Sequence, residues 1–121
     1  MDRIEIIHRI TEPTRYKIIG LLLKRHYCVR ALAKSLGVSE PAVSQHIRAL
    51  KETGIVTGER IGYQTHYIVK KESLAALFAE AAEEISECPP PPAIRKACYC
   101  EYGEDCARRV SEEGAGHERA E

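Results

Sequence analysis

The segment 39–50 constrains the fold more than any other part of this 121-residue chain. Ser39 is a favourable N-cap residue, and Pro41 suits the first turn of a helix. Apolar residues then recur at three-to-four spacing, at Val43, Ile47 and Leu50. This spacing predicts a short helix with one apolar stripe.

The opposite face of this predicted helix carries small or hydrogen-bonding side chains and one long cation. Its residues are Ala42, Ser44, Gln45 and Arg48. A helix that lies against base edges in a major groove needs such a face, because bulky or acidic groups would be repelled by the flanking phosphates. A solvated surface is the alternative reading, and the neighbouring segments have to decide between the two.

The neighbouring segments predict a winged helix-turn-helix. An amphipathic helix before the segment carries Val29, Leu32, Ala33 and Leu36, and only residues 37–39 separate it from the next helix. After Gly54 the apolar period becomes that of two strands, with a hairpin tip near Gly62. We assign base contacts to Ser44, Gln45 and Arg48, and further DNA contacts to Ser39, Ala42, His46, Arg60 and Gln64.

Three further helices are predicted from the remaining apolar patterns. A short one carries isoleucines within residues 4–10, and a second begins at Pro13 with Thr11 as its cap and is buried nearly all round. The last spans 71–87 and has a long apolar stripe, which we expect to pair with its copy in a second subunit, together with the first helix. The expected fold class is mainly α with a small β-hairpin, dimerising through its first and last helices.

Charge divides the chain into two halves, although its formal net charge is zero. Up to Glu72 there are 13 Lys or Arg and 7 Asp or Glu, and beyond it 5 and 11, giving +6 and −6. A basic first half suits a polyanion such as double-stranded DNA. No run has the apolar length of a membrane span and no signal peptide is evident, so we expect a cytoplasmic protein without a membrane partner.

Four of the five cysteines lie in the acidic half, one directly before and three after four consecutive prolines at 89–92. They are Cys88, Cys98, Cys100 and Cys106, with Cys28 alone in the first half. Clustered thiolates in a reducing compartment bind soft ions such as zinc or arsenite, form iron–sulfur clusters or act as redox sensors. The spacing predicts a class of ligand without naming an ion, and Cys28 could complete the site or be a small packing residue.

The order of these elements resembles the arsenic- and metal-responsive repressors of the ArsR–SmtB type. The resemblance covers residues 4 to 86 and rests on Glu-Pro-Thr-Arg-Tyr-Lys-Ile-Ile at 12–19, Leu-Ala at 32–33, Leu-Gly-Val-Ser at 36–39, Pro-Ala-Val-Ser-Gln-His-Ile at 41–47, Leu50 and Gly-Ile-Val at 54–56. It implies a winged-helix homodimer on a palindromic operator. Of the family's sensing sites, Cys28-Val29-Arg30 keeps only the first thiol of a Cys-Val-Cys sequence, and 72–87 lacks the His and Asp of a zinc site.

The sequence therefore predicts a DNA-binding repressor that releases its operator when cysteine thiolates bind a soft metal or metalloid. The expected domains are 1–87 for DNA binding and dimerisation, 88–110 for a Pro/Cys-rich sensor and 111–121 for a disordered tail. A redox or iron–sulfur switch on the same cysteines is one alternative, and a winged-helix protein-interaction module with a structural zinc is another. We do not expect an enzyme, because no nucleophile, base and orienting group stand at interpretable spacing.

Overall fold

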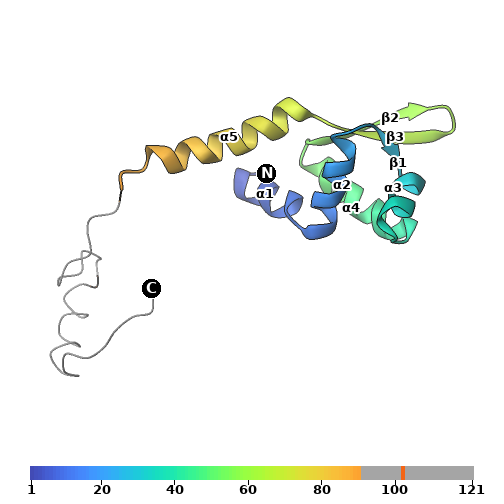
Figure 1. Cartoon of the computed structure of the whole chain (residues 1–121), viewed down its shortest axis with the longest axis horizontal. Helices are drawn as coiled ribbons and strands as arrows, with labels where there is room; N and C mark the ends of the chain where they lie inside the picture. Colours follow the sequence, from blue (N-terminus) through green and yellow to red (C-terminus); the bar gives the residue numbers. More distant parts are fainter. Residues whose placement is uncertain (91–101, 103–121) are drawn as a thin grey trace, which may run out of the picture. The chain divides into compact units, whose positions relative to one another are not determined.

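The computed structural model describes residues 1–90 and 102 of the chain, and Figure 1 shows its elements. Residues 1–87 form one compact unit, and the chain beyond them is a second unit. Along the first unit the elements are α1 (Arg3–Ile10), α2 (Pro13–Leu22), β1 (Tyr27–Cys28), α3 (Val29–Leu36), α4 (Glu40–Glu52), β2 (Val56–Ile61), β3 (Gln64–Val69) and α5 (Lys71–Glu87). Within the described residues, no helix is both long and apolar enough to cross a bilayer.

The helix-turn-helix predicted from the sequence is confirmed as α3 and α4. α3 ends at Gly37, whose φ of 68° is the left-handed conformation that favours glycine at a helix C-terminus. Ser39 then caps α4 by accepting a hydrogen bond from the Ala42 backbone N–H, at 3.2 Å. The two caps make the turn between the helices short and leave little freedom in the direction of α4.

The wing is confirmed too, and the sheet has a third strand, for which the sequence analysis gives no prediction. β2 and β3 form an antiparallel hairpin, and β1 pairs with the other edge of β3, so the strand order is β1-β3-β2. β1 is only two residues long, and its pairing partners Tyr67 and His66 lie about forty positions away. Gly62 closes the hairpin with a φ of 65°.

The core of the unit is apolar and lies where α2, α3, α4 and the sheet meet. Its fully buried side chains include Ile10, Ile18, Leu32, Val43, Leu50 and Val56. No polar or charged residue of the described part is buried in it. The apolar stripe of α4 is therefore its inner face, and the other side of the helix is left toward solvent.

Two predictions about the first helices are wrong in detail. Thr11 does not cap α2, because its hydroxyl donates to the Ile7 carbonyl at the end of α1; the Glu12 carboxylate instead accepts from the Arg15 backbone N–H, at 2.9 Å. Helix α2 is not buried nearly all round either, since Tyr16 within it and Leu23 at its C-cap are exposed. Both residues line a groove of about 410 Å³ between α2 and α5.

Candidate nucleic-acid interface

The outward face of α4 consists of the side chains that the sequence assigned to DNA. Ser44, Gln45 and Arg48 are exposed, while Val43 and Ile47 on the other side are at most 2% exposed. Ala42 is half-buried, and Ser39 at the N-cap is exposed. Because α4 is held by its buried stripe, this hydrogen-bonding face is presented on a rigid element, as base recognition requires.

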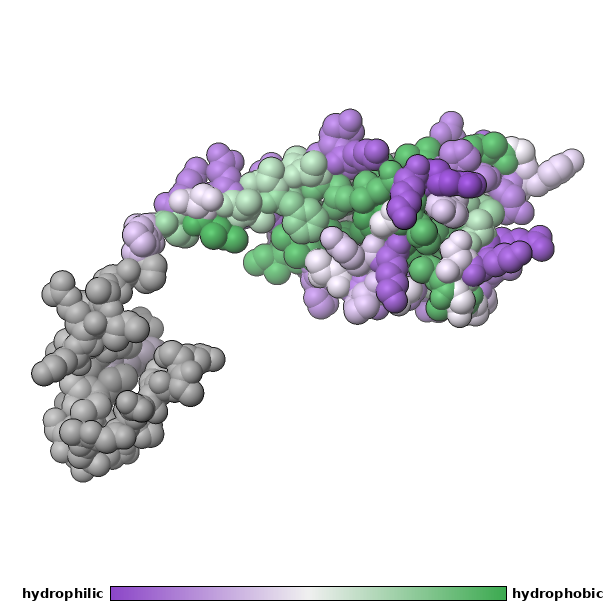
Figure 2. Space-filling model, viewed as in Figure 1, coloured by the Kyte–Doolittle hydropathy of each residue, from purple (hydrophilic) through white to green (hydrophobic). Residues whose placement is uncertain are grey.

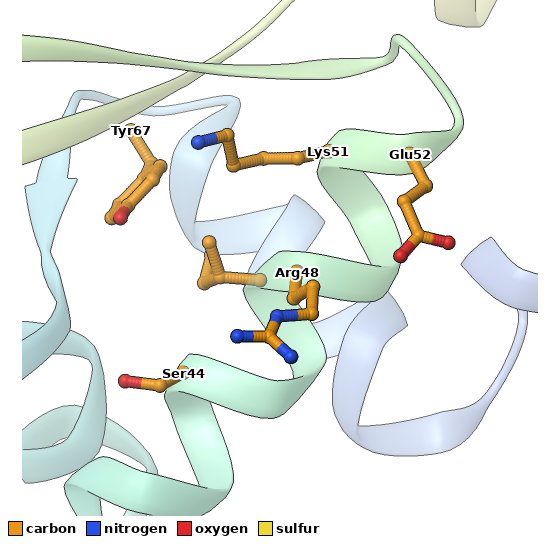
Figure 3. A pocket seen from close by; sticks show the side chains of 6 residues that line it. Ser44, Arg48, Lys51, Glu52 and Tyr67 are labelled. Carbon is orange, nitrogen blue, oxygen red and sulfur yellow. The ribbon is translucent and has the colours of Figure 1, made fainter.

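A hollow of about 470 Å³ separates α4 from the sheet and adjoins this face (Figure 3). Its lining comes from α4 and β3, namely Ser44, Ile47, Arg48, Lys51, Glu52 and Tyr67. The Lys51 ammonium points to the Tyr67 ring and lies 5.9 Å from its centroid, a cation–π distance. Two cations, Arg48 and Lys51, therefore stand one helical turn apart beside the wing, where a phosphate strand could be neutralised.

A polar network that includes His46 joins α4 to α2. The Arg15 guanidinium donates from Nε to His46 Nδ1 at 3.3 Å, and a Glu12 carboxylate oxygen lies 3.7 Å from the same nitrogen. The hydrogen bond from the Arg15 backbone N–H lowers the pKa of Glu12, against a smaller opposing effect of burial. His46 is half-buried within this network, so it faces α2, and the DNA contact assigned to it remains a prediction.

A second polar tie joins α1 to the end of α4. The Arg9 guanidinium donates from one nitrogen to the Glu52 carboxylate at 2.6 Å and to the Ala49 carbonyl at 3.2 Å. This hydrogen bond from Arg9, supported by its charge, lowers the pKa of Glu52. Arg9 and Arg15 were missed by the sequence analysis, because their partners lie about thirty to forty positions away and no local pattern marks them.

The wing residues assigned to DNA are exposed near its tip. Arg60 lies on β2 opposite Thr65, and Gln64 opens β3 opposite Ile61. The Arg60 guanidinium is close to the turn, donating to the Gly62 carbonyl at 3.4 Å. Both side chains thus stand on the strands next to the hairpin turn, beyond the hollow lined by α4 and β3.

The candidate thiols divide between described and undescribed parts of the chain. Cys28 is half-buried where β1 meets α3, and Cys88 is exposed just after α5. Cys98, Cys100 and Cys106 lie outside the described residues. In residues 1–90 and 102, no three His, Cys, Asp or Glu side chains are gathered as a metal site. The chemistry of the thiol set suits a soft ion, but the described thiols alone do not form a site for one.

Comparisons with known proteins agree with this geometry. Residues 12–57 match the family model described as bacterial regulatory protein, arsR family. Over 83 residues the chain is 35% identical to the HTH-type transcriptional repressor SmtB of Mycobacterium tuberculosis; the match covers 69% of this chain and 62% of that repressor. The chain thus spans less than two thirds of this relative's length.

Two solved structures extend the comparison. A possible transcriptional regulator for arsenical resistance is 25% identical, with a TM-score of 0.60 over 93% of this chain and 98% of the other. The homodimeric winged helix-turn-helix DNA-binding domain of a possible ArsR-family regulator from Mycobacterium bovis is 28% identical, with a TM-score of 0.57, and the match covers 69% of this chain and 77% of that domain.

Proposed function

The chain belongs to the ArsR–SmtB family of winged-helix transcriptional regulators, and we propose that it is a homodimeric repressor that leaves its operator when cysteine thiolates bind a soft metal or metalloid. Members of this family are transcriptional regulators and not enzymes, in agreement with the sequence analysis. DNA binding, dimerisation and ligand response are three steps of the proposal, and each has its own support.

The outward face of α4 beside the wing carries the DNA-binding step. Ser44, Gln45 and Arg48 are exposed on a helix whose other face is locked into the core. An Arg donates to guanine O6 and N7 in the major groove, while a Gln can pair with adenine. Arg60 and Gln64 on the wing would contact the backbone beside the groove, and the +6 first half of the chain favours the approach to DNA.

Dimerisation is supported by apolar surface that the unit leaves uncovered. Phe78 and Ile85 on α5 are 39% and 75% exposed, and Ile4 on α1 is 79% exposed. Figure 2 shows apolar surface continuing along α5 from the body of the unit. A second copy would cover these side chains and place two α4 helices on the half-sites of a palindromic operator. The relative from Mycobacterium bovis is described as homodimeric.

The ligand step rests on the chemistry of the thiols at positions 88, 98, 100 and 106, with Cys28 as a further candidate. When bound, a trivalent arsenic or a soft divalent ion would supply bonds to several sulfurs at once. Release of DNA requires that the ligand bind the low-affinity conformer more tightly, and a typical coupling is about 1–3 kcal/mol. Cys28 precedes the first residue of α3, so a bond to its sulfur would act directly on the helix-turn-helix.

An operator gel-shift titration with arsenite and zinc as separate probes tests the ligand step. We expect one of them to weaken binding about 5–150-fold in the natural chain, and we expect the C98S/C100S double variant to lose this response while it binds DNA normally. Cys28→Ser is the matched single-thiol variant and reports whether that sulfur takes part.

Three outcomes would contradict this proposal. A brown, absorbing protein after anaerobic purification would favour the iron–sulfur alternative. An oxidant-dependent response that arsenite and zinc do not reproduce would favour a redox switch. Stoichiometric zinc in a chain without salt-dependent DNA binding would favour a protein-interaction module.

A further inference from the structure

The outer face of the three-stranded sheet carries a group of metal-ligand side chains that the DNA interface does not use. Cys28 on β1 and Glu59 on β2 are both directly opposite His66 on β3. Opposite residues of antiparallel strands project to the same face, so these three form one row across the sheet. His26 stands two positions before Cys28, on the same side of the chain as this row.

Two of these side chains are already in contact. The Nδ1 atoms of His26 and His66 are 2.8 Å apart, and the two rings meet edge to face with centroids 4.8 Å apart. A hydrogen bond at this distance needs one ring to donate and the other to accept, so at least one ring presents a neutral nitrogen lone pair. Neutral imidazole nitrogen is also the commonest metal ligand in proteins.

Positive charge is held on the other face of the same strands. The alternate residues Tyr27 and Tyr67 are paired with each other, and each has a cation over its ring. The Arg25 guanidinium lies 4.9 Å from the Tyr27 centroid, and the Lys51 ammonium lies 5.9 Å from the Tyr67 centroid. The Arg25 guanidinium also donates to the backbone carbonyl of His26, at 3.4 Å, whereas the residue opposite His66 on β2 is the acidic Glu59.

We propose that His26 and His66 form a binding site for a divalent ion of the zinc class on the outer face of the sheet. Two imidazole nitrogens bound at about 2.0–2.1 Å to a tetrahedral ion are about 3.3 Å apart. The rings therefore need to separate by only about half an ångström to admit the ion. Water can take the remaining positions, and Glu59, opposite His66, adds a favourable negative charge.

Such a site would join two parts of the DNA-binding unit. His26 leads into β1, which continues without a gap into α3, and His66 is a central residue of the wing strand β3. An ion bound to both rings fixes the start of the helix-turn-helix against the wing. This inference does not depend on the thiols beyond residue 87, and the proposed function gives no role to His26 or His66.

A calorimetric zinc titration of the full chain tests it, with Cys88, Cys98, Cys100 and Cys106 changed to Ser so that they do not compete. We expect this parent to bind about one Zn²⁺ per subunit, and His26→Ala to weaken binding more than about tenfold, since even groups that only support a metal ligand have effects of that size. His8→Ala removes an exposed histidine from α1 and is the matched control. Zinc should also raise the Tm of the parent and of the control, but not that of His26→Ala.

Two results would overturn the proposal: no saturable zinc binding by the parent, or equal zinc affinity in the parent and in His26→Ala. His26 is exposed outside the strands, so its replacement tests the site without the risk of unfolding that a change at His66 carries. Because the parent lacks the four thiols, failure here leaves the arsenite response of the natural chain untouched, and the reverse also holds.

Discussion

Helices α4 and α5 each carry a long apolar stripe, but only one of the stripes is covered. On α4, Val43, Ile47 and Leu50 are at most 2% exposed. On α5, which is four residues longer, Leu77 is the one buried residue and Ile85 is 75% exposed. In Figure 1 α4 lies inside the body of the unit, and α5 extends away from it.

An apolar stripe at helical spacing can therefore pack into the core of its own unit, as on α4, or stay largely exposed, as on α5. The stripe of α4 is matched by apolar side chains of the chain itself, so it fixes the DNA-facing side of that helix. Only Leu77 and Leu74 of the α5 stripe pack against the core of the unit, and helix α1 is joined to α5 by ion pairs from Arg3 to Glu80 and Glu84. Exposed ion pairs stabilise little, and our proposal is that a second copy of the chain covers the remaining apolar surface of α5.

The largest expected effect is on the free energy of unfolding, and it distinguishes the buried stripe of α4 from the exposed stripe of α5. Leu50→Ala on α4 should lower the free energy of unfolding by about 2–5 kcal/mol, because it removes a fully buried side chain and leaves a cavity. Urea denaturation at low protein concentration, followed by circular dichroism, measures it. Ile85→Ala on α5 is the control and should cost less than about 1 kcal/mol. Equal losses would show that the α5 stripe is already covered in the monomer.

The second effect concerns self-association. Phe78→Ala should weaken the dimer by about 2 kcal/mol, the size expected when a large aromatic anchor is removed from an interface. Sedimentation equilibrium of both proteins gives the two dissociation constants. Glu83→Ala, at an exposed position of the same helix, is the matched control and should change the dimer little. A dimer unaffected by Phe78→Ala would place the interface elsewhere.

Much of this fold follows from periodicity that can be read locally. Three-to-four spacing marks α3, α4 and α5, and the change to alternation after Gly54 marks the wing. β1 could not be predicted, because two residues are too few to establish a period and the strand exists only through its pairing with Tyr67 and His66. The same holds for Glu12 as a cap, since Thr11 beside it is the better capping residue by type.

The candidate site, too, follows only in part from local sequence patterns. The exposed face of α4 follows from the helical period once Val43 and Leu50 are placed inside. The orientation of His46 does not, because it depends on Arg15, which is 31 positions away. Nor does the pairing of His26 with His66, which needs the register of β1 on β3. Contacts between distant segments are therefore the part that the structure adds.

The third effect asks whether the outward face of α4 reads DNA. Arg48→Ala should weaken operator binding by about 1–3 kcal/mol if its guanidinium pairs with a guanine, and it should relax the preference at that base pair. Gel-shift titration at fixed salt on operator and single-base variants measures both. Lys17→Ala removes an exposed positive charge from α2 and should have a smaller effect, the same on every sequence. Unchanged operator binding by Arg48→Ala would show that Arg48 does not contact a base.

The smallest effect concerns the polar network of Glu12, Arg15 and His46 that joins α4 to α2. The pKa of Glu12 is lowered mainly by the backbone N–H of Arg15, with His46 also contributing. A carboxylate with a lowered pKa stabilises the fold above its unfolded pKa near 4.5, and this stabilisation is lost as the pH falls through its folded pKa.

Glu12→Gln keeps the shape of the side chain but removes its charge. The free energy of unfolding should therefore depend less on pH below about pH 5, and at pH 7 it should fall by less than about 1 kcal/mol. Urea denaturation at several pH values measures the slope. Glu83→Gln on α5 is the matched control and should leave the slope close to that of the natural chain, because Glu83 is exposed on the helix that projects from the unit. If the Glu12→Gln curve runs parallel to the natural one, α4 is held by its apolar stripe alone, and the polar ties around His46 do not distinguish it from α5.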